Sequence, residues 1–341
     1  MLAANFGNYG RWLPPQISEH GGQIDNLIDV LHYFMAVLFI GWGIFFVYTL
    51  LKFRHREGHR ATYEPVKGKA SKYAEIGVGA FEVFLLVGLS MPVWAAYKNQ
   101  PPEKSGKPGE DPVEIRVIGE QFQWDFHYPG PDGKFGRTDA SLITGTNPIG
   151  LDENSDGAAD DLYYINEMHI PTGRDIYFRI TSKDVIHSVS IPALRIKQDA
   201  IPGMEIPIWF KVKEGATTEA LKESMTQDYP TQKADWYRLR HHVSCEDYKD
   251  KSGQIILAKD ADLGSTHGMG TEKIKALREA GVASIKMQPR NPLEMVCAQL
   301  CGNSHFKMKA QVMTHSPEDF QKWIDEEVKK KNQEVEFDTD F

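Results

Sequence analysis

The sequence is poor in cysteine, and this scarcity excludes several classes of protein. Its 341 residues contain three cysteines, too few for the disulfide framework of a small secreted domain. Neither a Cys-x-x-Cys nor a Cys-x-x-Cys-His motif occurs, so a thioredoxin-type dithiol and a covalently attached c-type haem are not expected. A basic tract with interleaved aromatic residues is also missing, which argues against nucleic acid as a partner.

Charge is nearly absent from two long stretches. Val30–Leu51 has no formal charge, and Ile76–Tyr97 has only Glu82. Each stretch would extend about 33 Å as a helix, enough for the hydrocarbon core of about 30 Å. The alternative is a pair of buried core helices, but stretches this long and this apolar favour two transmembrane helices within residues 30–97.

The segment between these stretches, residues 52–74, is strongly basic. It carries seven basic and two acidic side chains, a net charge of +5, whereas the tail of residues 1–29 has Arg11 as its one basic side chain. Positive loops stay in the cytoplasm, so we expect the tail and residues 98–341 to be extracytoplasmic. Residues 1–26 lack the apolar core of a secretory signal peptide.

The periodicity changes after the second apolar stretch. Short alternating runs rich in β-branched and aromatic residues, such as "VEIRVIGEQFQWDFHY" and "GRDIYFRITS", are separated by Gly, Pro and Asp. They predict an antiparallel β-sandwich or barrel of about seven to ten strands. Residues 129–161 and 215–291 are expected to be insertions or elaborated loops. The second segment is polar and partly helical, at "EKIKALREAG". Ser316 and Pro317 are typical of a helix start and predict a C-terminal helix.

Soft ligands gather in "CAQLCGNSHFKM", residues 297–308. Thiolate, imidazole and thioether groups from Cys297, Cys301, His305 and Met308 suit copper or zinc. The alternative is two buried free cysteines beside an ordinary histidine and methionine. A rigid site needs a further ligand from elsewhere in the fold, and His187, at the end of a β-rich run, is available.

The segments "GEQFQWDFHY", "TSKDVIHSVSIPALRIKQDAIPG" and "CAQLCGNSHFKM", together with the two apolar stretches, resemble subunit II of the heme–copper cytochrome c oxidases. The resemblance covers roughly two thirds of the chain, and it rests on these sequence motifs rather than on amino-acid composition. It implies an all-β, cupredoxin-like Greek-key domain after a transmembrane hairpin. It also implies a dinuclear copper centre, CuA, with the ligands His187, Cys297, Gln299 through its carbonyl, Cys301, His305 and Met308.

The resemblance further implies a function. Such a chain accepts electrons singly from cytochrome c, or from a neighbouring respiratory complex. It passes them to the haem and copper centres of subunit I, where oxygen reduction is coupled to proton pumping in the bacterial inner membrane. A quinol oxidase subunit would lack the copper ligands, and a nitrous oxide reductase would need a second His-rich domain. A nitric oxide reductase subunit, or an anchored sandwich with structural zinc, remains an alternative.

Four positions depart from the family pattern or extend it. Gln299 stands where the family has a glutamate that reaches magnesium, so a magnesium ion at the subunit I boundary would be held more weakly. Phe122 occupies the usual tryptophan position for electron entry, with Trp124 next, although plain sheet packing explains both equally well. Glu75 matches a glutamate linked to proton uptake, but an interfacial carboxylate beside Lys72 is the alternative.

Three further features are independent of the copper motif. "DENSDGAADD" fits the start of a calcium loop through Asp152, Asn154, Asp156 and Asp160, although solvated acidic loops look similar and the twelfth position is Tyr163. Cys245 is expected to be a free thiol. Residues 98–341 carry a formal charge of −9, and we expect residues 215–291 to form a docking surface for a dedicated electron donor rather than for a free basic cytochrome c. The alternative is a surface elaboration without a role in docking.

Overall fold

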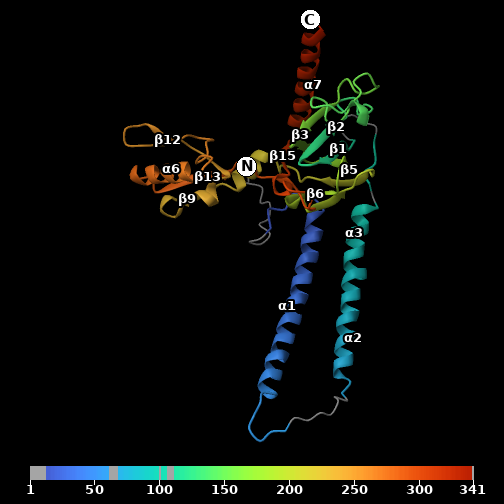
Figure 1. Cartoon of the computed structure of the whole chain (residues 1–341), viewed down its shortest axis with the longest axis vertical. Helices are drawn as coiled ribbons and strands as arrows, with labels where there is room; N and C mark the ends of the chain where they lie inside the picture. The colour runs from blue at the N-terminus through green and yellow to red at the C-terminus, as the bar shows by residue number, and fades with distance from the viewer. Residues whose placement is uncertain (1–12, 61–67, 100, 106–110, 340–341) are drawn as a thin grey trace. The chain divides into compact units, whose positions relative to one another are not determined.

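The computed structural model describes residues 13–60, 68–99, 101–105 and 111–339. The chain divides into two compact units (Figure 1). One unit comprises His20–Pro101, and the other comprises Met1–Glu19 and Pro102–Phe341. Parts of two predicted segments, residues 1–12 of the tail and residues 61–67 of the basic loop, lie outside the described residues.

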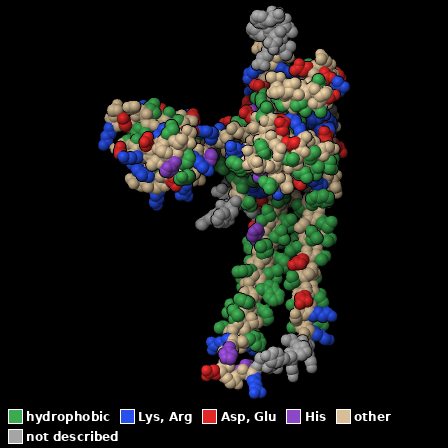
Figure 2. Space-filling model, viewed as in Figure 1, with side chains coloured by type: hydrophobic (Ala, Val, Ile, Leu, Met, Phe, Trp, Pro, Cys, Tyr) green, Lys and Arg blue, Asp and Glu red, His purple; other side chains and the backbone are tan. Residues whose placement is uncertain are grey.

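The smaller unit is a hairpin of two apolar helical rods. The first rod is α1 (Gly21–Lys52), and the second runs through α2 (Ala70–Val83), a π-helical segment η1 (Phe84–Ser90) and α3 (Met91–Lys98). Over their most apolar stretches 0% and 6% of the residues are buried within the protein, and apolar side chains cover both rods (Figure 2). A core helix would be covered by protein, so the rods fit transmembrane helices instead.

The larger unit contains two five-stranded sheets. The order of the first is β3-β2-β1-β5-β8, and the order of the second is β4-β15-β14-β6-β7. The first sheet consists of β1 (Val113–Glu120), β2 (Gln123–Tyr128), β3 (Leu162–Ile165), β5 (Asp175–Ser182) and β8 (Ile206–Lys211). The second consists of β4 (Glu167–Pro171), β6 (His187–Ile191), β7 (Ile196–Ala200), β14 (Glu294–Cys297) and β15 (Lys309–His315).

Alternation along the strands builds the core between these sheets. In β5, Ile176, Phe178 and Ile180 are fully buried and alternate with less buried residues, because successive side chains of a strand point to opposite faces. The predicted all-β sandwich is confirmed. Its sheets are mixed rather than antiparallel, since β1–β5 and β4–β15 are parallel pairs. The chain visits the other sheet between the members of each pair, and such a crossover allows parallel pairing.

The described end of the N-terminal tail is part of this sandwich. Ile17 is fully buried, its N–H donates to the carbonyl of Ala193 at 3.0 Å, and its carbonyl accepts from the N–H of Lys213 at 2.8 Å. Ser18 forms a bridge with Val212 just after β8. Residues 13–19 therefore extend the sandwich, a contact that sequence analysis did not predict.

The C-terminal helix α7 (Pro317–Thr339) begins as predicted. The Ser316 hydroxyl accepts a hydrogen bond from the N–H of Asp319 at 3.1 Å, which satisfies a donor of the first turn. Phe320 is buried, and the ring of Trp323 stacks on that of His169 with 4.1 Å between centroids. These apolar contacts attach the helix to β4 and β15.

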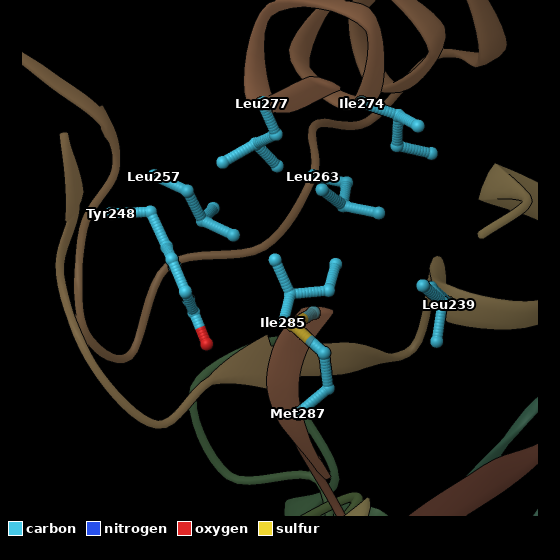
Figure 3. Packing of buried hydrophobic residues seen from close by; sticks show 8 residues of the cluster. All are labelled: Leu239, Tyr248, Leu257, Leu263, Ile274, Leu277, Ile285 and Met287. Carbon is cyan, nitrogen blue, oxygen red and sulfur yellow. The ribbon is translucent and has the colours of Figure 1, made fainter. Parts of the chain in front are cut away.

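The segment predicted as a polar insertion over residues 215–291 is a folded body rather than a set of loops. Its helix α4 (Thr218–Ser224) packs on the sandwich, where the N–H of Thr314 donates to the Thr218 hydroxyl at 2.8 Å. The remainder has its own hydrophobic core, drawn in Figure 3. That body contains β9 (Gln227–Pro230), η4 (Thr231–Lys233), α5 (Trp236–Leu239), β10 (His242–Ser244), β11 (Tyr248–Lys249), β12 (Ile255–Leu257), α6 (His267–Glu279) and β13 (Ser284–Pro289).

The shorter predicted insertion, residues 129–161, is an irregular segment with one short 3-10 helix, η2 (Ala140–Leu142). Ile149, Leu151 and Ala158 form a small buried cluster with Ile118 of β1. The segment is also tied to β2 by a fully buried contact of 2.6 Å between the Asp161 carboxylate and His127 Nε2. It therefore packs against β1 and β2 instead of standing in solvent.

Candidate metal centre

Pairing between two strands joins the two predicted ligand segments, which are more than a hundred residues apart. Strand β6 begins at His187 and β14 ends at Cys297, and the two strands are antiparallel neighbours, with Cys297 opposite Val189. Beyond the ladder, the N–H of Ala298 donates to the carbonyl of Ser188 at 2.9 Å. The loop after Cys297 then returns through η5 (His305–Lys307), and the N–H of Cys297 donates to the carbonyl of Met308 at 3.1 Å.

All six predicted donors meet around the two thiols. The sulfur atoms of Cys297 and Cys301 lie 3.9 Å apart. Nδ1 of His187 is 3.8 Å from the Cys297 sulfur, and the Gln299 carbonyl oxygen is 3.1 Å from it. On the other side, the Cys301 sulfur lies 3.5 Å from His305 Nδ1 and 3.7 Å from Met308 Sδ. The arrangement is nearly symmetric, because each sulfur has one imidazole and one weak donor beside it.

This donor set fits a pair of copper ions better than one zinc ion. Two thiolates at this separation can bridge two metals, with one imidazole and one weak donor for each. Structural zinc takes four donors in a tetrahedron, which would leave the Met308 thioether and the Gln299 carbonyl without a role. His187, Cys297 and Cys301 are buried, and their ligand atoms lie within 4.8 Å of one another, so little water would reach a metal there.

A carboxylate orients the histidine of the first segment. Asp184 Oδ1 lies 2.8 Å from His187 Nε2, which places the ring proton on Nε2 and leaves Nδ1 free to bind a metal. Such outer contacts fix the tautomer and the angle of a ligating imidazole. The other oxygen of Asp184 accepts from the N–H of Gln121 at 2.7 Å, so the carboxylate is itself held on both sides.

The two thiols differ in acidity. Burial raises the pKa of Cys297, but hydrogen bonding to His187 and to nearby backbone groups outweighs it and lowers that pKa to about 6. Burial and the negative charge of Cys297 raise the pKa of Cys301 to about 11. Without a metal, therefore, one thiolate forms first, and a bound cation is needed to ionise the second near neutral pH.

A glycine makes room for the His187 ring. A Cβ atom at Gly119 in β1 would lie 2.7 Å from Cδ2 of His187. Trp124, fully buried, closes the same side, with its ring centroid 5.8 Å from that of His187 in an edge-on arrangement. Sequence analysis did not single out Gly119, although a glycine inside a strand often indicates such a close approach.

The predicted electron-entry residues lie beside this centre at different depths. Phe122 is half-buried in the turn between β1 and β2, and a Cβ atom at Gly302 in the cysteine loop would be 3.1 Å from two of its ring atoms. Trp124 is fully buried, so a docked donor would meet Phe122 first. Their roles in electron transfer stay predictions, as does the role of Glu75, which lies in the helical hairpin with its carboxylate 3.3 Å from the Ser71 hydroxyl.

The acidic loop predicted to bind calcium is engaged by other parts of the chain. Asp152 pairs with Arg137 at 2.7 Å, and Asp156 lies 3.9 Å from Lys134. Asp160 accepts from the N–H of Asp132 at 2.9 Å. Among the described residues, a group of three side chains placed closely enough to hold a metal is found at the copper motif. No such group is found among the described residues of this loop. Calcium binding through Asn154 and these carboxylates stays a prediction. Cys245 is half-buried with a free thiol, as predicted.

Two five-stranded sheets carrying a cluster of two thiols, two imidazoles and a thioether are the features of a cupredoxin-like domain, and the cluster is compatible with a soft metal such as copper. Residues 113–218 match the family model described as cytochrome c oxidase subunit II, periplasmic domain. This match and the relatives that follow confirm the resemblance to cytochrome c oxidase subunit II that the sequence indicated.

Two relatives illustrate the similarity. The chain is 29% identical over 217 residues to the alternative cytochrome c oxidase subunit 2 of Bradyrhizobium diazoefficiens, covering 63% of this chain and 75% of that protein. It is 22% identical over 363 aligned positions to cytochrome c oxidase subunit 2 of Thermostichus vulcanus, covering 93% and 79%. A crystal structure of the periplasmic domain of cytochrome oxidase subunit II from Bradyrhizobium japonicum is 20% identical, covering 68% of this chain and 99% of that one. Its TM-score is 0.32.

Proposed function

We propose that this chain is the electron-entry subunit of a respiratory terminal oxidase. His187, Cys297, Cys301, His305, Met308 and the Gln299 carbonyl would hold a dinuclear copper centre, CuA, which would let the chain take up electrons one at a time from cytochrome c. The electrons would go on to the haem and copper centres of subunit I, where oxygen reduction would be coupled to proton translocation. The observation that carries the proposal is the pair of cysteine sulfurs 3.9 Å apart, each with an imidazole nitrogen beside it. The haem groups belong to the partner subunit.

In this proposal the chain's residues provide rigidity. Bound copper would supply one-electron redox chemistry without a proton. His187 and Cys297 sit on two hydrogen-bonded strands, and Asp184 holds the imidazole, so the donors would move little when the charge of the site changes. Burial of both cysteines and of Trp124 excludes water. A preformed, dry site lowers the reorganisation that each electron transfer requires.

The copper proposal is tested on the full chain, purified in detergent. A fragment beginning near residue 110 would lack Ile17, which is fully buried in the sandwich. We expect two bound coppers per chain, a purple colour and a mixed-valence EPR signal with seven hyperfine lines. A single zinc ion, or one copper with an ordinary four-line spectrum, would contradict the proposal.

The placement in the membrane is a further part of the proposal. The helical hairpin crosses the bacterial inner membrane twice, the basic loop of residues 52–74 lies in the cytoplasm, and both termini and the metal domain lie on the periplasmic side. The two exposed apolar rods support it. Protease added to cells with an opened outer envelope should cleave within the periplasmic domain and spare residues 54–72. Cleavage of the basic loop under these conditions would show that the hairpin has the opposite orientation.

Gln299 bears on a second metal. Its carbonyl points to the Cys297 sulfur, while its side chain is exposed and would be the group that reaches a magnesium ion at the boundary with subunit I. A neutral amide attracts a hard cation less than a carboxylate does. We therefore expect weak magnesium binding there, and Gln299→Glu should strengthen it in the assembled oxidase, as measured by manganese substitution and EPR.

The folded insertion is proposed to dock the electron donor. Residues 215–291 carry twelve basic and eleven acidic side chains, a net charge of +1, within a domain whose total is −9. The sandwich is therefore the acidic part, and the insertion would not attract a basic cytochrome c by charge. A dedicated partner, such as a membrane-bound cytochrome c or a neighbouring respiratory complex, suits it better than a free cytochrome.

The docking proposal is tested by deletion. Since α4 packs on the sandwich, the cut should fall after it, with residues 227–289 replaced by a short flexible linker. If the insertion docks the donor, electron uptake from the native donor should fall while copper content and reduction by a small inorganic reductant stay unchanged. Unchanged uptake from the native donor would show that the insertion is a surface elaboration.

A further inference from the structure

The turn between β1 and β2 is linked to both ligand segments through one residue, Gln121. Its backbone N–H donates to Asp184 Oδ2 at 2.7 Å, and the other oxygen of that carboxylate lies 2.8 Å from His187 Nε2. Its side-chain amide nitrogen donates to the carbonyl of Cys301. One residue therefore contacts the histidine side of the centre through its main chain and the cysteine side through its side chain.

The cysteine loop is shaped to receive this turn. Gly302 adopts φ +137, a conformation that side chains disfavour. A Cβ atom there would lie 2.7 Å from Gln121 Nε2 and 3.1 Å from Cε1 and Cζ of Phe122. The absence of a side chain at Gly302 thus lets the amide reach the Cys301 carbonyl and lets the Phe122 ring lie against the loop.

We propose that Gln121 is a positioning residue for electron entry, whose amide holds Phe122 against the cysteine loop. This inference rests on the proposed function and deepens it. An electron arriving at the half-buried Phe122 ring crosses to the ligand loop by contact at Gly302, and tunnelling weakens steeply when such a contact opens. The Gln121–Cys301 hydrogen bond opposes that opening.

The rest of the hairpin is anchored independently of the Gln121 side chain. The Lys183 ammonium lies 2.6 Å from Asp125 Oδ2 and also pairs with Glu120, which holds the last residue of β1 and the third residue of β2. Gln123, in the same hairpin, donates through Nε2 to Asp125 Oδ1 at 3.0 Å, a bond within β2 itself. Gln121→Ala should therefore loosen the turn alone, and Gln123→Ala is its matched control.

The first test is amide hydrogen exchange on the full chain, with and without copper. In Gln121→Ala we expect the backbone amides of residues 121 and 122 to exchange about fivefold faster, because loss of one ordinary hydrogen bond changes an opening equilibrium by about that factor. Gln123→Ala should leave them unchanged. Gln121→Glu keeps the length of the side chain but removes the donor, so it should resemble the alanine variant and serves if that variant folds poorly.

The second test uses the copper-loaded oxidase complex. Gln121→Ala should retain its copper and EPR signal and be reduced more slowly than Gln123→Ala by cytochrome c, while hexaammineruthenium(II) reduces both at equal rates. The inference is overturned if exchange and reduction by cytochrome c match the wild type, or if copper is lost, since the side chain would then hold the ligand loop itself. Failure to bind two coppers in the wild-type chain would refute the proposed function, whereas the exchange result stands without copper.

Discussion

Replacing Gly119 by alanine should disturb the metal centre through a single added carbon. Gly119 lies in β1 opposite Trp124 and beside Ser182 of β5, and it is not among the glycines at positive φ, so alanine fits the backbone. The new Cβ would lie 2.7, 3.0 and 3.2 Å from Cδ2, Cγ and Cβ of His187. The imidazole has little freedom to retreat, because Asp184 holds Nε2 at 2.8 Å.

The expected size of the effect follows from two limits. If the ring stays in place, overpacking should lower the free energy of unfolding by about 1–3 kcal/mol. If the ring moves, it loses the Asp184 contact and its alignment with Cys297, and the loss of such an orienting contact typically lowers metal affinity about 10–100-fold. We expect the strain to be shared between these two responses. Both the free energy of unfolding and the copper affinity should then fall, and the copper affinity should be the more sensitive of the two.

The assay compares urea unfolding of the metal-free chain and copper binding against a chelator of known affinity. The control is Gly268→Ala in helix α6, where a Cβ would meet nothing within 4 Å. Alanine should stabilise that helix by about 0.5–1 kcal/mol and leave copper binding unchanged. Wild-type stability together with wild-type copper affinity in Gly119→Ala would refute the steric argument.

Three other predictions follow from the contacts described. Met308→Leu should retain both coppers and shift the reduction potential, because it removes only a weak thioether donor; loss of all copper on metal analysis would mean that the donor roles are misassigned. Ile17→Ala should lower the free energy of unfolding in urea by about 2–5 kcal/mol, since the side chain is fully buried against the sandwich, and a neutral result would place the N-terminal segment outside the cooperative unit. Burial lowers the pKa values of His127, His169 and His315. As the pH falls, these histidines are therefore protonated more readily in the unfolded chain than in the folded one, and the free energy of unfolding should decrease below about pH 6.5. A urea midpoint that rises on acidification would contradict this sign.

The hydrophobic core of the insertion could not be predicted from sequence patterns. Its core residues are isolated apolar positions spread over a helix, a hairpin and a strand, among them Tyr248, Ile274 and Met287. Each short element contributes one or two of these side chains, and only the packing of the elements gathers them into one core. Helix α6 was predicted from its local sequence, because a helical period is a property of neighbouring residues. The strands around it depend on distant partners.

The sequence alone determined the features that local chemistry controls. Long uncharged stretches required a membrane-compatible hairpin, Ser316 capped a helix, and the spacing of Cys297 and Cys301 placed two sulfurs in one loop. The tertiary structure decided the rest. Pairing of β6 with β14 brings His187 to the cysteines, packing against Gly119 orients its ring, and Ile17 joins the sandwich through contacts made with Ala193 and Lys213. These tertiary contacts depend on which distant segments pair, and burial across the whole fold determines that pairing rather than any single stretch of sequence.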